Sequence, residues 1–487
     1  MSASNSAPSP AAATAQNGTR GKLRTSLGAA AGTCVENYDF VAYGTASALY
    51  FGDVFFPESD PVVGTLLAFV TLGVGFLMRP VGGAVGGHLG DKYGRKPVLV
   101  AALLTMGIAT VLIGLLPTYA QAGIAAPILL VLIRMVQGLA FGAEWGGAVM
   151  MAYEHAPRRR RGLYAAIPQA GNPLGIALAN IVFLLSVNLD SDLAWRIPFL
   201  ASSVLIVVGL VVRVKLEESP EFEETKASGQ TVKNPLVTVL RDDWRNILRI
   251  IALRVVESCA YYLTATYLLS YITERDEDDR GIALAGIVVA SLLAVGTTIL
   301  SGALTDRIGR RKLYLAGCLL AVAFGFPMFL MANTGNPVLV VLIYLIAIGV
   351  IHAALTGTQA AWFAELFKTN TRTSGASLGY QIAASVAGFA PFLAVLLAES
   401  FDWAGPAGFY VVIGLVGLLG VATTRETWGP RERAAAEAAD RAELLATVPP
   451  ARETTREADG IDAPAEASAT ASASNTSCGG SDPVRHR

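Results

Sequence analysis

The sequence predicts an all-α polytopic membrane protein whose twelve transmembrane helices form two pseudo-symmetric bundles of six. Composition, the spacing of long apolar runs and an internal repeat lead to this prediction. Hydrophobic residues make up 53% of the 487 residues and charged residues only 15%, whereas a soluble protein carries roughly 25% charged residues. Because so few charges cannot cover a water-exposed surface, most of the chain is expected to face lipid or other helices.

Twelve apolar runs of about 20 residues are long enough to cross roughly 30 Å of hydrocarbon as helices. Each run is continuous rather than alternating, which excludes a transmembrane β-barrel. Charged or turn-rich segments delimit the runs. In order, the expected spans are residues 26–54, 62–87, 98–117, 124–152, 162–188, 195–214, 246–273, 281–304, 313–333, 336–365, 372–399 and 405–424.

Lys and Arg are concentrated in alternate loops. They crowd the loops after the second, fourth, eighth and tenth spans, as in the run Arg158–Arg161, and do not occur after the first, third, ninth and eleventh spans. Basic loops stay on the cytoplasmic side of a membrane. We therefore expect a multi-pass protein of the plasma or inner membrane with both termini in the cytoplasm.

Polar segments separate the expected parts of the chain. Residues 1–23 form a Ser/Ala/Asn/Pro tract that is expected to be a disordered tail. Residues 215–245 are expected to be a cytoplasmic linker between six-helix bundles at residues 24–214 and 246–425. The cytoplasmic tail at residues 426–487 is expected to form one amphipathic helix and then mostly disordered, low-complexity sequence.

Charge, cysteine content and motifs exclude several other classes of protein. The formal net charge of −1 gives no basic excess for binding nucleic acid. The four cysteines lie far apart without a Cys-x-x-Cys pair, so neither a disulfide scaffold nor a zinc site is predicted. The sequence contains no Walker phosphate loop and no set of nucleophile, base and orienting residue. We therefore expect a protein that is not an enzyme and needs no cofactor or metal.

Two short motifs recur in both halves of the sequence at nearly the same offset. The pattern Asp-x-x-Gly-Arg-basic follows the second expected span and recurs after the eighth, 215 residues later. A Glu that precedes an Arg by seven residues follows the fourth span and recurs after the tenth, 211 residues later. Repeated halves around a central site are typical of secondary transporters. The residues are Gly90, Asp91, Gly94, Arg95, Lys96, Asp306, Gly309, Arg310 and Arg311 in the first motif, and Glu154, Arg161, Glu365 and Arg372 in the second.

The first motif has two interpretations. It is either a basic turn that anchors helices at the membrane interface or a gating element that locks neighbouring helices in one state. Its duplication, and glycines that permit a tight reversal, favour the gating element. Asp91 would then accept hydrogen bonds from a helix N-terminus or from an Arg across the loop.

Further motifs lie along most of the chain, at Glu36–Phe40, Phe55–Pro57, Arg79–Gly83, Arg134–Gly138, Glu144–Gly147, Trp195–Phe199, Glu217–Phe222, Ala252–Arg254 and Gly379–Gln381. With these motifs the chain resembles the major facilitator superfamily, and within it the metabolite:proton symporter family, with the shikimate-permease branch most similar. The resemblance covers about residues 24 to 425. Asn37 and Ala143 depart from it, because the family usually has Trp and Gly there. The departure at Asn37, beside two acidic residues, leaves the exact substrate open.

Seven charged residues lie deep within the expected spans. A charge at the centre of a bilayer costs roughly 2.5–3.5 kcal/mol. Charges kept there therefore generally face a hydrated cavity or one another, and they favour a role in a transport pathway. The seven residues are Glu36, Asp39, Arg79, Arg134, Glu144, Arg254 and Glu257.

The first span carries Glu36, Asp39 and Tyr43 on one helical face. Two carboxylates this close favour retention of a proton on one of them near neutral pH. Asp39, with Glu36, is therefore the predicted proton-coupling site. The alternative is that an Arg from another span neutralises each carboxylate.

The fourth span places Arg134, Gln137 and Glu144 within a narrow arc. Arg134 offers a planar fork that suits a substrate carboxylate. The alternative is a salt bridge from Arg134 to Asp39 or Glu36, and both roles could hold in turn.

The seventh and tenth spans supply the remaining predicted substrate-binding groups. Arg254 and Glu257 lie three residues apart, with Tyr261 beside them, and an internal ion pair is the simpler account of the two charges. His352 and Gln359 share one stripe of the tenth span. A lone His in an apolar helix is more often a hydrogen-bonded packing residue than a titrating group.

Arg79 precedes Pro80 well inside the second span. Pro80 could kink the helix while Arg79 satisfies the freed carbonyl groups, or Arg79 could bind an anion on the cytoplasmic side. The sequence does not decide between these roles.

Together these observations predict proton-coupled import of a small carboxylated, shikimate-like metabolite by alternating access, in a chain that functions as a monomer. The expected partners are the substrate, protons and the lipid bilayer, and no nucleic acid. The alternative is import of a zwitterionic osmolyte such as betaine or proline. A membrane sensor with this fold is a further alternative, and a membrane enzyme is disfavoured.

Overall fold

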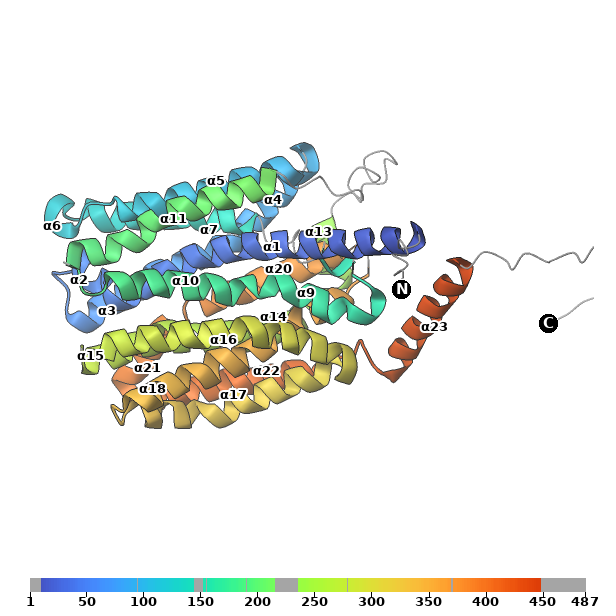
Figure 1. Ribbon diagram of the computed structural model, residues 1–487. Coiled ribbons are helices and arrows are strands. Elements are labelled where there is room, and N and C mark those ends of the chain that lie inside the picture. The colour runs from blue at the N-terminus through green and yellow to red at the C-terminus, as the bar shows by residue number, and fades with distance from the viewer. Residues whose placement is uncertain are drawn as a thin grey trace, which may run out of the picture. The chain divides into compact units, whose positions relative to one another are not determined.

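The computed structural model describes residues 10–93, 95–143, 152–154, 156–189, 191–214, 235–277, 279–368 and 371–447. Within these ranges the regular structure is entirely helical (Figure 1). Residues up to Ala438 form one compact unit, and a second unit begins at Ala439. The all-α fold predicted from the sequence is confirmed.

The first half of the sequence contributes most of its expected spans as one long helix or two consecutive helices. The short helix α6 lies between the third and fourth spans. The helices are α1 (Pro10–Leu49), α2 (Phe51–Phe55), α3 (Pro61–Leu77), α4 (Arg79–Tyr93), α5 (Arg95–Gly114), α6 (Tyr119–Ala122), α7 (Ala125–Gly142), η1 (Arg158–Arg160), α9 (Arg161–Gln169), α10 (Gly171–Ser186) and α11 (Ser191–Val214).

The second half is built in the same way, and α23 lies where the amphipathic helix after the last span is expected. The helices are α13 (Pro235–Asp242), α14 (Trp244–Tyr262), η2 (Leu263–Tyr267), α15 (Leu268–Arg275), α16 (Asp279–Ile308), α17 (Arg310–Ala332), α18 (Pro337–Tyr344), η3 (Leu345–His352), α19 (Ala353–Glu365), α20 (Arg372–Ala387), α21 (Ala390–Phe401), α22 (Ala404–Thr423) and α23 (Pro430–Thr447).

Ten helical segments of the described chain are long and apolar enough to cross a membrane. The first and seventh expected spans are not among the ten, although α1 and the run from α14 to α15 cover their ranges. Both spans carry charges at mid-depth, namely Glu36 and Asp39 in the first and Arg254 and Glu257 in the seventh. These charges lower the mean hydropathy of the first and seventh spans.

The first helix begins earlier than the sequence predicts. Residues 1–23 are expected to be a disordered tail, but α1 already starts at Pro10. Proline is favoured in the first turn of a helix, and the alanines that follow have the highest helix propensity. The helix therefore begins where local propensity favours one, ahead of the first expected span.

Two expected spans contain π-helical segments. The segment η2 directly follows Tyr261 and Tyr262 in the seventh span, and η3 ends at His352 in the tenth. A π turn inserts an extra residue and re-aims the side chains around it, and such turns are frequent at functional sites. Tyr261, Tyr262 and His352 line the cavity that is described in the next subsection.

Glycines let α3 and α4 approach α7 closely. A Cβ atom added at Gly138 would collide with the carbonyl oxygen of Gly75, and one added at Gly142 would collide with that of Arg79. Small residues permit this close packing of membrane helices. The approach brings Arg79 of α4 and Arg134 of α7 against the same aromatic rings.

Helices from the two halves of the sequence contact each other at several levels. Figure 1 shows α1, α10 and α16 side by side, and α10 contacts both of the other two. In addition, α1 contacts η2 and α15, α3 contacts α20 and α21, and α9 contacts α16 and α19. One such contact is polar, since the Ser385 hydroxyl donates to the carbonyl oxygen of Phe76 at 2.8 Å.

Candidate functional site

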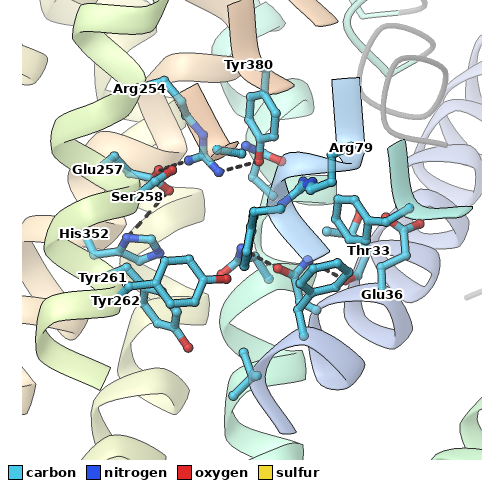
Figure 2. Close-up of a pocket in the computed structure, with 18 residues that line it drawn as sticks. Thr33, Glu36, Arg79, Arg254, Glu257, Ser258, Tyr261, Tyr262, His352 and Tyr380 are labelled. Atoms are coloured by element: carbon cyan, nitrogen blue, oxygen red, sulfur yellow. Dashed lines mark hydrogen bonds and ion pairs between the residues drawn. The ribbon is translucent and has the colours of Figure 1, made fainter. Parts of the chain in front are cut away.

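A small cavity lies between the two halves of the sequence (Figure 2). Its volume is about 40 Å³, which holds a few water molecules and is too small for an organic metabolite. Its ionisable lining residues are Glu36, Arg79, Arg254, Glu257 and His352. Aromatic rings of Phe40, Phe76, Phe141, Tyr261, Tyr262 and Tyr380 surround these groups.

Arg79 projects into the cavity from the first turn of α4 (Figure 2). Its guanidinium lies 3.8 Å from the centre of the Phe141 ring, and its Nε donates to Gln381 Oε1 at 3.0 Å. Among the described residues Arg79 forms no ion pair. The side chain is nearly fully buried, so its charge is held by aromatic faces and one neutral amide.

Arg254, by contrast, has its counter-charge beside it. Its Nη1 forms an ion pair with Glu257 Oε2 one helical turn further along α14. Its Nη2 donates to the Tyr380 hydroxyl at 2.6 Å, and the guanidinium lies 4.0 Å from the centre of that ring. Gln359 Oε1 accepts a longer bond from Arg254 Nη1 at 3.4 Å. This is the internal ion pair that the spacing of the two charges permits.

His352 lies on the other side of Glu257 (Figure 2). Its Nδ1 is 3.6 Å from Glu257 Oε1, and its Nε2 is 3.3 Å from the Thr356 hydroxyl. Glu257 also accepts hydrogen bonds from Thr356 at 2.8 Å and from Ser258 at 3.0 Å. The carboxylate of Glu257 is therefore well satisfied even without a charged His352.

A second buried polar cluster lies within the first half of the sequence and outside the cavity lining. Asp39 is fully buried, beside Arg134 and the hydroxyl groups of Thr110 and Ser202. Neither oxygen of Asp39 has a hydrogen-bond partner of normal geometry among the described residues. We call this cluster the Asp39–Arg134 chamber.

Arg134 is also fully buried in this chamber. Its Nη1 donates to Gln137 Oε1, and the Gln137 amide donates to the Thr110 hydroxyl at 2.7 Å. Its Nε and Nη2 have no hydrogen-bond partner among the described residues. The guanidinium lies 4.0 Å from the centre of the Tyr43 ring and 4.4 Å from that of Phe40.

The Phe40 ring connects the chamber to the cavity. The guanidinium of Arg79 lies 5.3 Å from the centre of this ring, and that of Arg134 lies 4.4 Å from it. The Phe76 ring is likewise 5.0 Å from Arg79 and 5.9 Å from Arg134. The Phe40 and Phe76 rings thus contact both buried cations.

The second copy of the Asp-x-x-Gly-Arg motif joins helices of both halves. Asp306 accepts hydrogen bonds from the backbone N–H groups of Gly162 and Leu163, at 2.9 and 3.0 Å, near the N-terminus of α9. Asp306 also pairs with Arg310 at 2.8 Å, and Arg310 pairs with Glu365 at 3.1 Å. In the second copy of the motif, Asp306 thus makes both kinds of contact that the sequence predicts for Asp91 in the first copy.

Other residues of the repeated motifs strengthen this end of the helices. Gly309 adopts a φ of 99°, a left-handed conformation that suits glycine. Arg372 approaches Glu154 of the first half at 3.7 Å. Gly94 lies outside the described residues, as do the surroundings of Gly90 and the side chains of Asp91, Arg95 and Lys96. For Arg311, the structure records a hydrogen bond from Nε to the carbonyl oxygen of Val421 at 3.1 Å.

The structure divides the predicted site residues into two groups. Those in the cavity lining are Glu36, Arg79, Arg254, Glu257, Tyr261 and His352. Those beside it are Asp39, Tyr43, Arg134, Gln137 and Gln359. Glu144 lies outside the described residues. Their roles in binding and proton coupling stay predictions.

Sequence reasoning missed several lining residues. Tyr380 lies in one of the motifs noted above but carries no charge, so intramembrane charge did not mark it. Asn172 and Gln169 are polar residues within an expected span. A search for all intramembrane polar side chains would have found them, whereas Phe40, Phe76 and Phe141 cannot be told from ordinary core residues in the sequence.

Comparisons with known proteins agree with this architecture. A model of the Major Facilitator Superfamily matches residues 51–390. The chain is 39% identical to the inner membrane metabolite transport protein YhjE of Escherichia coli (strain K12), over 81% of this chain and 92% of that protein. It is also 39% identical to the shikimate transporter of the same strain, over 80% of this chain and 91% of that protein.

Other relatives include the proline/betaine transporter of Salmonella typhimurium (strain LT2), which is 34% identical over 84% of each chain. Among solved structures, the xylose transporter XylE from E. coli, in a partially occluded inward-open conformation, superposes with a TM-score of 0.64. The two share 18% identity, and the match covers 84% of this chain and 99% of that one. This likeness confirms the fold with twelve transmembrane helices.

The relatives are transporters and not enzymes, which confirms that part of the prediction. The match to the family model covers more than half of the chain, and the relatives at 39% identity cover most of it. The resemblance inferred from the motifs is therefore confirmed. The chain belongs to the major facilitator superfamily of membrane transporters.

Proposed function

We propose that this protein is a proton-coupled symporter that imports a small carboxylated metabolite across the inner membrane by alternating access, with both termini in the cytoplasm. The observation that carries this proposal is Arg79, a buried cavity-lining guanidinium without an ion pair among the described residues. The relatives named as a shikimate transporter and a metabolite transport protein support it.

A buried cation without a counter-charge is costly. In the cavity, Glu257 already neutralises Arg254, so Arg79 is the cation that a substrate carboxylate would relieve most. Its planar fork can hold both oxygens of a carboxylate. The rings around it exclude water and thereby strengthen that interaction. We therefore assign the carboxylate clamp to Arg79, whereas the sequence alone favours Arg134.

We assign the proton to Asp39. An ionised carboxylate with few hydrogen bonds is unfavourable at full burial, so the protonated acid suits the conformation seen here. A substrate anion on Arg79 would add negative charge close to the chamber, because Arg79 and Arg134 lie against the same two rings, Phe40 and Phe76. Added negative charge favours a bound proton. Anion and proton would therefore bind cooperatively, which is the requirement for symport.

The conformation fits the closed stage of such a cycle. Asp306 and the pair Arg372–Glu154 join the halves on one side of the cavity. Beyond the cavity in the other direction, Gly44 packs closely on Thr266 of η2. A cavity of about 40 Å³ would have to widen before a metabolite could bind. We propose that opening the Asp306 side releases substrate to the cytoplasm.

The test compares two matched substitutions, Arg79→Lys and Arg134→Lys, in proteoliposomes. Counterflow with shikimate, dehydroshikimate, aromatic acids, dicarboxylates and betaine first identifies a substrate. Arg79→Lys should then raise the concentration for half-maximal counterflow at least about tenfold, because Lys cannot reproduce the fork. Arg134→Lys should alter the dependence on the proton gradient more than this concentration. The reverse pattern would return the clamp to Arg134.

Import of a zwitterionic osmolyte is the second candidate. Relatives named as proline/betaine transporters favour it, and a zwitterion would need an acid as well as Arg79. Glu36 and Glu257 are the acids of the cavity lining, and one of them would have to meet the ammonium group of a zwitterion. Counterflow of betaine or proline but of no simple carboxylate would favour this candidate, as would activation by osmotic shift.

A further inference from the structure

One wall of the cavity is formed by neutral amides from α1, α9 and α10. Asn37, Gln169 and Asn172 line it, and they lie on the half of the chain opposite to Arg254 and Tyr380. The mechanism proposed above uses none of these three side chains. We call them the amide wall.

The hydrogen bonds of the amide wall fix its orientation. The amide N–H group of Asn37 donates to the backbone carbonyl of Thr33 at 2.7 Å, one turn earlier on α1. The Asn37 side-chain oxygen therefore points away from its own helix, and it accepts the amide N–H of Asn172 at 2.8 Å. This chain of bonds uses the donor of Asn172 and leaves its acceptor unoccupied.

The acceptor of Asn172 stays unmatched in the conformation seen here. Its Oδ1 is buried and has no hydrogen-bond partner among the described residues. Buried acceptors normally have a partner, and one without a partner lowers stability. The oxygen belongs to a cavity-lining residue, so a bound molecule can supply the missing donor.

From this geometry we infer that Asn172 is a specificity-determining residue that accepts a hydrogen bond from a hydroxyl group of the substrate, and that Asn37 positions it. The inference rests on the proposed function, because the proposed function places the carboxylate at the other end of the substrate on Arg79. It narrows the substrate class to hydroxylated carboxylic acids.

A hydroxyl group fits this wall better than an ammonium group does. Asn172 and Gln169 are neutral, and a buried ammonium is stabilised best by a carboxylate. A hydroxyl group both donates and accepts, so it can satisfy the Asn172 oxygen and still bond to a neighbouring amide N–H. A site built for a substrate hydroxyl rejects the analogue without it, because the amide is then left unpaired.

The experiment measures binding to the full-length protein in detergent by ligand-dependent shifts in melting temperature. The probes are two matched pairs, shikimate with 1-cyclohexene-1-carboxylate and 3,4-dihydroxybenzoate with benzoate. The unsubstituted protein should bind the hydroxylated member of at least one pair about tenfold more tightly. Asn172→Leu should weaken binding of the hydroxy acid until the ratio of the two affinities is about one. The affinity for the apolar acid should stay within about twofold of its value in the unsubstituted protein. Asn172→Ala is a second variant that adds no bulk and should give the same loss.

Asn180→Leu is the matched control. Asn180 lies two turns further along α10, is buried, and has both halves of its amide satisfied by Ile176 and Thr45. It does not line the cavity, so the preference for the hydroxy acid should survive in this variant even if its melting temperature falls. Asn37→Leu leaves the Asn172 oxygen in place but unoriented, and it should reduce the preference partly.

The outcomes separate this inference from the proposed function. Binding of the acids with no preference for the hydroxylated members, or a preference that survives both Asn172 variants, would overturn the role of Asn172 and leave the carboxylate clamp intact. Failure of every carboxylate to bind would count against the proposed function itself. A preference for proline over glycine betaine that Asn172→Leu removes would assign the wall to an ammonium group and overturn the hydroxyl assignment.

Discussion

Two of the buried arginine–acid clusters among the described residues, Arg254–Glu257 and Asp39–Arg134, differ in how completely their hydrogen bonds are satisfied. In the second half, Arg254 is paired with Glu257, Tyr380 accepts a hydrogen bond from Arg254, and Ser258 and Thr356 donate to Glu257. Of the charged groups of this pair, only Arg254 Nε lacks a partner among the described residues. In the Asp39–Arg134 chamber, both oxygens of Asp39 and two of the three guanidinium nitrogens of Arg134 lack hydrogen-bond partners among the described residues.

The difference indicates different tasks. An ion pair with nearly all of its hydrogen bonds made is a rigid element whose charge is already neutralised, and removing one partner is strongly destabilising. A cluster with unmet bonds has alternatives of similar free energy, and a change in charge nearby can shift it between them. We therefore expect the second-half cluster to shape the cavity and the chamber to respond to protons. Each prediction below tests this division.

The largest effect should come from breaking the satisfied pair. Glu257→Gln leaves Arg254 buried without its counter-charge, and it should lower the free energy of unfolding by about 3–5 kcal/mol. Melting of the purified protein in detergent would measure the loss. The double variant Arg254→Gln with Glu257→Gln should regain most of it, since no uncompensated charge remains. If Glu257→Gln melts like the unsubstituted protein, the pair is not the rigid element described here.

The next largest effect should come from a substitution in the Asp39–Arg134 chamber. It should change proton coupling rather than stability. Asp39→Asn replaces a carboxyl group without described hydrogen bonds by a neutral group of the same shape, so the change in unfolding free energy should stay below about 1 kcal/mol. With a pH difference of two units, a symporter moving one proton can accumulate substrate about 100-fold, or about 2.7 kcal/mol.

Asp39→Asn should abolish this accumulation in proteoliposomes but retain counterflow, which needs no net proton movement. Full proton-driven accumulation by Asp39→Asn would remove Asp39 from the coupling step. Loss of both accumulation and counterflow would mean that the chamber is structural, like the second-half pair.

These two clusters also show what the sequence could predict. Spacing alone placed Arg254 and Glu257 on one face and suggested their ion pair, because both lie on one helix and three residues apart. Asp39 and Arg134 lie on different helices, so their relation to the cavity depends on how α1 and α7 are rotated. Helical periodicity identifies a polar face of a helix. It does not show whether that face contacts the other half of the chain or other helices of the same half.

Arg79 illustrates the same limit. Its charge and depth were visible in the sequence, but its place in the cavity depends on the close approach of α4 to α7 at Gly142. The sequence predicts contacts of this type for Asp91 but not the partners of Asp306, because nothing local links Asp306 to Gly162 and Leu163, more than 140 positions away. Composition and internal repeats predict the fold class, whereas the rotation of each helix depends on tertiary packing.

A matched pair of tyrosines gives a smaller test of the comparison. Tyr380→Phe removes a hydroxyl that accepts a hydrogen bond from a charged group, Arg254, at 2.6 Å, whereas Tyr43→Phe removes a neutral bond to Thr71, also 2.6 Å. Bonds to charged groups are worth about 1.5–3 kcal/mol and neutral ones about 0.5–1.5 kcal/mol. Melting should therefore show the larger loss for Tyr380→Phe. Equal losses would mean that the Arg254 cluster gains little from its charge.

His352→Gln should have the smallest effect on stability. This variant therefore tests the smallest difference between the two clusters. Glu257 is satisfied by Arg254, Thr356 and Ser258 without His352, and His352 Nδ1 lies 3.6 Å away, beyond a good hydrogen bond. The glutamine amide can still meet Thr356, so the loss of stability should stay below about 1 kcal/mol.

Proton-driven accumulation should survive within about twofold in His352→Gln, when measured beside Asp39→Asn in the same vesicles. The ring of His352 packs on that of Tyr261, with 5.1 Å between the ring centres. Loss of a residue that only packs would slow exchange as well as accumulation. Abolished accumulation with intact counterflow would therefore make His352 the proton carrier. In that case the satisfied cluster would be the responsive one, and the division between the two halves would be reversed.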